Sequence, residues 1–83
     1  MPLELTQHAR NMLRQRGIDE AWVERTVQDP EATEQDRIDP ALEHCVRRIP
    51  ECGNRVLRVI ADRSVTPNRI VAAFFDRGVK VSS

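Results

Sequence analysis

Apolar residues recur every three or four positions over residues 5–13, which is the period of a helix that faces a core on one side. At 100° per residue, one stripe collects four apolar side chains, namely Leu5, Ala9, Met12 and Leu13. Thr6 is a favourable N-cap, and Gly17 supplies the left-handed residue that commonly ends a helix. The pattern therefore predicts a short first helix over residues 6–17.

The same period returns after a tight connection and predicts a second helix over residues 20–28. Its apolar stripe consists of Trp22, Val23, Thr26 and Val27. Asp19 is the expected N-cap, and Ile18 can pack on Val23 as a hydrophobic staple. The Asp29-Pro30 pair ends the helix, because a proline disfavours helical backbone in the residue before it. Trp22 is interpreted as a core anchor rather than a binding residue.

Beyond Pro30 the period changes to two, which is typical of strands. Four strands are predicted, a weak polar edge strand over residues 32–37 and stronger strands over 42–49, 55–61 and 69–75. Short connections favour antiparallel pairing. The expected fold is a single α+β domain over residues 1–83, with two N-terminal helices packed on one face of a small antiparallel sheet of three or four strands.

Alternation assigns the two faces of the predicted strands. In residues 55–61, Leu57, Val59 and Ala61 share the face that we expect the helices to cover, and Arg58 projects from the open face. In residues 69–75, simple alternation places Val71, Ala73 and Phe75 on one face and Ile70, Ala72 and Phe74 on the other. Because both faces are apolar, this last strand is predicted to lie inside the sheet.

Charge is balanced overall but unevenly distributed. The chain has 13 basic and 13 acidic side chains, which argues against a broad nonspecific nucleic-acid binder. Residues 1–43 carry a balance of −5, and residues 44–83 carry +5. Twelve of the 13 basic residues are arginines, whose planar guanidinium matches phosphate geometry, although an arginine-rich genome gives the same composition. One basic face is therefore compatible with a neutral domain.

Several classes of protein are not expected. The longest apolar run, residues 70–75, is too short to span a bilayer, and no signal peptide is recognisable, so we expect a cytoplasmic protein without membrane contact. Cys45 and Cys52 are the only cysteines, and a disulfide is not expected without secretion. Two thiols and two histidines without paired spacing do not form a zinc site. We expect no metal and no cofactor.

Five segments in order carry a family resemblance: His8-Ala9, Arg16-Gly17-Ile18, Asp29-Pro30-Glu31, Leu57-Arg58-Val59-Ile60 and Ile70-Val71-Ala72-Ala73-Phe74. Over about residues 5–76 the chain resembles a bacterial family known only as a domain of unknown function, number 4258. That family looks like a compact member of the fold shared by barnase, colicin nucleases and RelE-type or BrnT-type toxins. The resemblance implies a metal-independent endoribonuclease, often the toxin half of a toxin–antitoxin pair.

The resemblance also implies site residues. The histidine of the first helix falls on His8, the arginine before the glycine on Arg16 and the arginine of the central strand on Arg58. A basic position on the preceding strand falls on Arg47 or Arg48. We therefore take His8, as the base, and Arg58 as candidate catalytic residues, and Arg16 with Arg47 or Arg48 as candidate substrate-binding residues for the phosphate. No general acid is evident.

Two positions depart from the family pattern. Where relatives tend to carry a threonine and a tyrosine on the last strand, this chain has Ala72 and Phe74, and it contains no tyrosine. The alternative is therefore a non-catalytic RNA-binding or protein-binding module that kept the fold and lost the chemistry. The expected partners are RNA or the ribosome, an antitoxin protein, and a second copy of the chain in a homodimer.

Overall fold

The computed structural model describes residues 3–77. The helices are α1 (Gln7–Arg16), α2 (Glu20–Gln28) and the short 3₁₀ helix η1 (Pro50–Cys52). The strands are β1 (Leu3–Leu5), β2 (Ala32–Gln35), β3 (Leu42–Ile49), β4 (Arg55–Asp62) and β5 (Asn68–Phe75). Within this part of the chain, no helix combines the length and the apolar character that crossing a bilayer requires.

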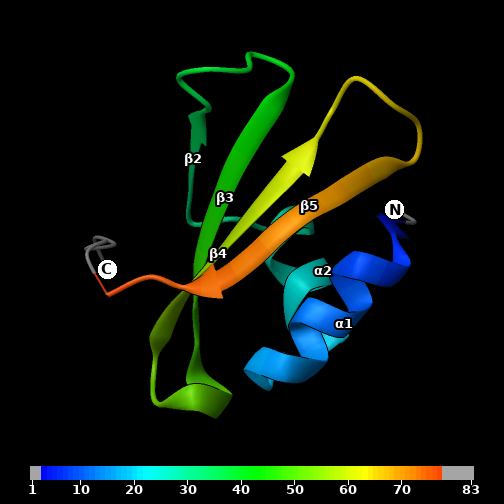
Figure 1. Ribbon diagram of the computed structural model, residues 1–83. Helices are drawn as coiled ribbons and strands as arrows, with labels where there is room; N and C mark the ends of the chain where they lie inside the picture. The colour runs from blue at the N-terminus through cyan, green and yellow to red at the C-terminus, as the bar shows by residue number, and fades with distance from the viewer. Residues whose placement is uncertain (1–2, 78–83) are drawn as a thin grey trace.

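The elements form two layers, with α1 and α2 together on one face of a twisted sheet (Figure 1). The strand order is β1-β5-β4-β3-β2, in which β1 runs parallel to β5 and the other neighbours are antiparallel. The α+β class and the two helices are as predicted. The sheet is a correction, because it is mixed and has five strands instead of three or four antiparallel ones.

The strand that sequence reasoning missed is β1. It is three residues long, and Leu5 lies in it although the helical stripe had claimed this residue. A three-residue strand ending next to a helix cap gives almost no period-two pattern. Its pairing with β5 places β5 inside the sheet, as predicted from the apolar character of both its faces.

The helix ends follow the sequence closely. The Thr6 hydroxyl accepts a hydrogen bond from the Ala9 N–H at 3.1 Å, and the Asp19 carboxylate accepts one from the Ala21 N–H at 2.9 Å. Gly17 ends α1 with φ at +67°, a left-handed conformation that glycine adopts without a steric penalty. Because each cap satisfies backbone groups that the helix leaves unpaired, the boundaries of α1 and α2 could be predicted well.

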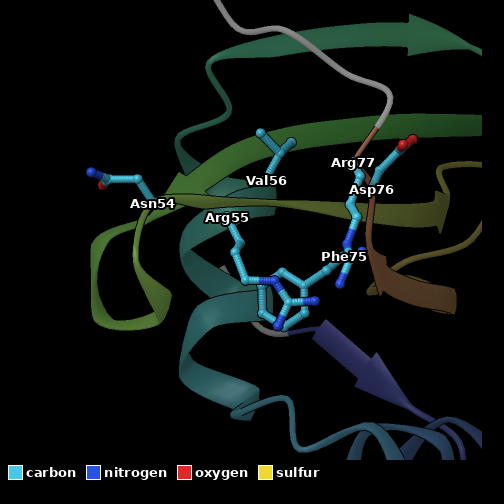
Figure 2. Close-up of a pocket in the computed structure, with 6 residues that line it drawn as sticks. All are labelled: Asn54, Arg55, Val56, Phe75, Asp76 and Arg77. Carbon is cyan, nitrogen blue, oxygen red and sulfur yellow. The ribbon is translucent and has the colours of Figure 1, made fainter.

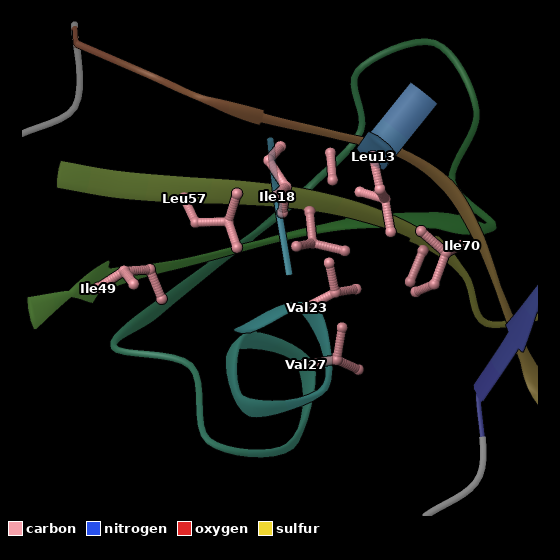
Figure 3. Close-up of a cluster of buried hydrophobic side chains, with 10 residues drawn as sticks. Leu13, Ile18, Val23, Val27, Ile49, Leu57 and Ile70 are labelled. Atoms are coloured by element: carbon pink, nitrogen blue, oxygen red, sulfur yellow. The ribbon is translucent and has the colours of Figure 1, made fainter. Parts of the chain in front are cut away.

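The core lies between the helices and the sheet (Figure 3). Its buried residues are Leu13, Ile18, Val23, Val27, Ile49, Leu57, Val59, Ala61, Ile70 and Ala73. Leu57, Val59 and Ala61 are completely buried, as alternation along this strand predicted. Trp22 packs at the margin of the core, with its ring centroid 6.4 Å from that of Phe75.

Alternation along β5 is interrupted by an irregularity in register. Ala61 pairs with Ile70 but Ile60 pairs with Ala72, so Val71 is an extra residue between two pairs, as in a β-bulge. Ile70 and Ala73 consequently both reach the core, and Val71 is 42% exposed. The prediction that Val71 shares a face with Ala73 and Phe75 was wrong, because a bulge shifts the side-chain period by one residue.

The opposite face of the sheet is left open by the described helices. Register places on its middle part the side chains of His44, Val46, Arg48, Val56, Arg58, Ile60, Ala72 and Phe74. We call these residues the open face. Apart from the buried Val46, they are half-buried, and they mix apolar side chains with two arginines and a histidine.

Candidate functional site

Arg58 lies at the centre of the open face. It sits on β4, the middle strand, between Val46 of β3 and Phe74 of β5. Its Nε donates to Asp76 Oδ2 at 2.8 Å, and its Nη1 donates to His44 Nδ1 at 2.8 Å. The side chain is 15% exposed, so this guanidinium is held in one position rather than moving freely in solvent.

The contacts of His44 define its proton arrangement. A guanidinium has only donors, so Nδ1 of His44 must accept the hydrogen bond from Arg58. The ring proton then lies on Nε2, which donates to Asp36 Oδ1 at 2.7 Å. This geometry requires a neutral imidazole, because a proton on Nδ1 would face the donor of Arg58. Asp36, His44, Arg58 and Asp76 form one hydrogen-bonded series, which we call the polar chain.

Asp36 anchors the polar chain from the loop between β2 and β3. Its Oδ2 accepts hydrogen bonds from the backbone N–H groups of Asp39 at 2.9 Å and Ile38 at 3.1 Å. The Asp39 N–H, the His44 side chain and the Ile38 N–H together lower the pKa of the Asp36 carboxyl. Asp36 is therefore ionised at neutral pH and fixes the orientation of the His44 ring. The polar chain carries one net negative charge.

A hollow opens beside the polar chain. It encloses about 250 Å³ and is lined by Glu34, Gln35, Asp36, Arg37, Ile38, His44 and Arg58. Ile38 at its rim is 94% exposed, the most exposed large apolar side chain in the described part of the chain. Solvent and small polar groups can therefore reach the contact between Arg58 and His44 from this side.

The two positions that depart from the family pattern lie next to Arg58. Phe74 pairs directly with Arg58, and Ala72 pairs with the neighbouring Ile60. Both side chains belong to the open face. Neither the Phe74 ring nor the Ala72 methyl group carries a hydroxyl.

His8 is placed far from this arrangement. It lies in the first turn of α1, is exposed, and lines a separate hollow with Asn11, Met12, Gln15 and Arg16. Because α1 covers the other face of the sheet, the sheet itself separates His8 from Arg58. The two predicted catalytic residues do not meet in this structure.

Arg16 has a contact with the sheet, but at its edge. Its Nη1 donates to the carbonyl oxygen of Ala73 at 2.8 Å. Strand β1 pairs only with residues 68–70 of β5, so Arg16 covers a carbonyl on the part of that edge which β1 leaves free. This contact explains Arg16 as a structural residue on the helix side, away from the open face.

Register separates the two arginines that the sequence could not distinguish. Arg47 pairs with the buried Leu57 and therefore faces the helices, where its Nη1 donates to the Asp29 carbonyl at 2.9 Å at the end of α2. Arg48 lies on the open face, where its Nε pairs with Glu31 Oε2 at 3.2 Å. Arg48 alone of the two shares a face with Arg58.

His44 is the residue of this site that sequence reasoning missed. In the sequence it stands out only as a neighbour of Cys45, which points to the opposite face. The useful pattern is the alternation of His44, Val46 and Arg48 along one strand, which becomes informative once Val46 is paired with Arg58. Asp36 and Asp76 come from a loop and a strand end, and no periodicity could have placed them there.

The fold and the site thus define a small α+β domain with an arginine–histidine pair on the sheet face opposite the two described α-helices. A family model described as Domain of unknown function (DUF4258) matches residues 5–75. The match spans most of the chain, and the chain therefore belongs to this family, as the resemblance indicated. No curated protein and no solved structure matches the chain significantly.

Proposed function

We propose that this protein is a metal-independent endoribonuclease of the RelE and BrnT type, with its active site on the open face. The observation that carries the proposal is the 2.8 Å contact between Arg58 and an imidazole that Asp36 holds in one tautomer. A cation beside an oriented, neutral base is the pair that cleavage of RNA by its own 2′-hydroxyl requires.

In the proposed mechanism Arg58 binds the scissile phosphate. Its Nε and Nη1 are engaged within the described part of the chain, and Nη2 keeps its two N–H groups for a phosphate oxygen. A phosphate that also draws Nη1 away from His44 frees the Nδ1 lone pair. The incoming anion thereby prepares the base beside it, and Arg58 stabilises the charge that develops on phosphorus.

His44 then serves as the general base. Nδ1 takes the proton of the 2′-hydroxyl, and the 2′-oxygen attacks phosphorus as the bond to the 5′-oxygen breaks. The products are a 2′,3′-cyclic phosphate and a 5′-hydroxyl, whose proton comes from solvent because no general acid stands opposite His44 among the described residues. Asp36 accepts the Nε2 hydrogen bond throughout and stabilises the imidazolium that forms.

These assignments revise the expectation drawn from the sequence. His44 replaces His8 as the base because His44 touches Arg58. Of the two arginines that the sequence left open, Arg48 is kept as the second phosphate-binding residue because it lies on the open face. Arg16 is assigned to the edge of the sheet. The likeness to the RelE and barnase fold is part of the same proposal and is supported by two N-terminal helices on one face of the sheet.

A second candidate function is a binding module without catalysis. It is favoured by Ala72 and Phe74, which place no hydroxyl beside Arg58, and by the carboxylates that offset its charge. Such a module would bind RNA, the ribosome or an antitoxin protein through the open face. Salt-sensitive RNA binding without cleavage would identify it.

The test is cleavage of total RNA by the purified protein in EDTA, with free RNA and with translating ribosomes as substrates. We expect discrete products from the wild type and a loss of about 100-fold or more in both His44→Ala and Arg58→Ala. His8→Ala is the matched control and should keep wild-type activity, and circular dichroism confirms that each variant is folded. Intact RNA with both substrates would overturn the nuclease and leave the binding module.

A further inference from the structure

A second hollow lies at the end of the sheet where β4 begins and β5 finishes. It encloses about 460 Å³ and is lined by Asn54, Arg55, Val56, Phe75, Asp76 and Arg77. In Figure 2, the Arg55 and Arg77 side chains extend into the same part of the hollow, while the Asp76 carboxylate points away from them. Nothing in the proposed mechanism uses these two arginines.

Arg55 is fixed in place by an aromatic ring. Its guanidinium carbon lies 4.3 Å from the centroid of the Phe75 ring, a cation–π contact. Phe75 is held in turn by Trp22 at the margin of the core. A guanidinium that rests on a ring keeps its N–H groups at the rim free to donate outward.

Neither Arg55 nor Arg77 has a carboxylate partner among the described residues. Seven of the other arginines do form ion pairs with carboxylates. The carboxylate in the lining of the hollow, Asp76, is bound to Arg58. The hollow therefore gathers two arginines that form no ion pair among the described residues, and the one carboxylate in its lining is already paired with Arg58.

We propose that this hollow is a phosphate subsite, in which Arg55 and Arg77 hold a phosphate group of a nucleotide. Guanidinium groups that converge on one point suit the several oxygens of a phosphate, and the fixed Arg55 loses little freedom on binding. The outer face of the Arg55 guanidinium is also a plane on which a base can stack.

The hollow wraps around the end of the sheet, with Val56 on the side of the open face and Arg55 and Phe75 on the side of the helices. Val56 lines the hollow and lies two residues from Arg58 on the same side of β4, a spacing of about 7 Å along a strand. Asp76, which holds Arg58, directly precedes Arg77. We assign the phosphate to an RNA strand whose scissile phosphate lies at Arg58. This assignment to RNA rests on the proposed function. The existence of an anion-binding site at Arg55 and Arg77 does not depend on it.

The test is a titration followed by amide NMR, with AMP as the first probe and a 2′-O-methyl trinucleotide, which cannot be cleaved, as the second. We expect AMP to shift residues 54–56 and 75–77, and adenosine to leave them unchanged. Arg55→Gln and Arg77→Gln should each weaken AMP binding by about 10-fold or more. Arg14→Gln removes an exposed arginine of α1 that lines neither hollow, and it should leave AMP binding unchanged.

The outcomes separate this proposal from the nuclease. His44→Ala should bind AMP like the wild type, so the subsite stands even if no RNA is ever cut. The trinucleotide should bind more tightly than AMP and also shift Arg58 and His44. Equal loss of AMP binding in Arg14→Gln and Arg55→Gln would overturn the subsite in favour of diffuse surface charge. AMP binding with no gain for the trinucleotide would overturn RNA as the source.

Discussion

The two faces of the sheet share the same strands but differ in what their side chains do. On β4, Leu57 and Val59 are completely buried beneath the helices, whereas Arg58 between them points away from the helices and holds the polar chain. Adjacent positions in one strand thus belong to different environments. The comparison teaches that stability and chemistry can be altered independently at positions one residue apart.

The largest effect is expected on the covered face. Leu57→Ala removes a fully buried side chain and leaves a cavity, so the free energy of unfolding should fall by about 3 kcal/mol. Val56→Ala, one residue away on the open face, should cost about 1 kcal/mol or less because Val56 is only half-buried. Urea denaturation measures both, and equal losses would break the distinction between the faces.

The open face can be tested by restoring the absent hydroxyls. The double variant Ala72→Thr with Phe74→Tyr places two hydroxyls beside Arg58, and RNA cleavage should rise by about 10-fold or more if a proton donor is what this site lacks. Cleavage rates on a short fluorescent RNA provide the measurement. The control is Val71→Thr at the exposed bulge, which should leave the rate unchanged; an equal gain there would remove the argument for the two positions.

Arg47 and Arg48 are neighbours in the sequence that lie on opposite faces of the sheet, so their substitutions should have different effects. Arg47→Ala breaks a hydrogen bond to the end of α2 and should lower the free energy of unfolding by about 1 kcal/mol, with RNA binding unchanged. Arg48→Ala removes a surface ion pair and should cost about 0.5 kcal/mol or less, but it should weaken RNA binding. The reverse pattern in unfolding and filter-binding measurements would contradict the register of β3 against β4.

The smallest effect on stability is expected from the ion pair between Arg25 of α2 and Glu51 of η1 at the end of the sheet. Two hydrogen bonds from Arg25 of α2 lower the pKa of Glu51 in η1 from 4.5 to about 2. Because the folded-state pKa is depressed, the stabilisation is complete above the ordinary pKa and is lost as the pH falls toward about 2. Glu51→Gln should therefore lower Tm at neutral pH and match the wild type near pH 2.

Thermal unfolding followed by circular dichroism at several pH values measures this difference. Glu24→Gln, an exposed carboxyl on the same helix as Arg25, is the matched control and should follow the wild type at every pH. A Tm difference for Glu51→Gln that persists unchanged at the acid end would show that titration of this carboxyl is not its cause.

Local rules account for the parts of the fold that the sequence could predict. Thr6, Gly17 and Asp19 define helix ends through their own backbone and side-chain chemistry, and alternation along residues 55–61 assigns Arg58 to the open face. The bulge at Val71 and the three-residue β1 escaped prediction because both depend on pairing with distant strands. Short-range sequence patterns were therefore enough to predict the fold class, but they could not predict the register between paired strands.

The site was less predictable than the fold for the same reason. Arg58 could be placed on the open face from its own strand, but its partners come from β3, from Asp36 in the loop before β3 and from the end of β5. His8 was predicted as the base from the family resemblance, and nothing local indicates that a sheet separates it from Arg58. A hydrogen-bonded series drawn from separate segments requires tertiary structure to be seen.

The covering of β5 by Arg16 bears on how copies of this domain can assemble. At that side of the sheet, the described edge is a three-residue strand followed by a carbonyl already bound by a side chain. At the other side, β2 is exposed along its whole length. Of these two described edges, only β2 can pair with an added strand along its whole length. Two copies that pair their β2 strands across a two-fold axis would leave neither β2 edge exposed. Edge-to-edge growth through these strands then ends at a pair rather than a fibre.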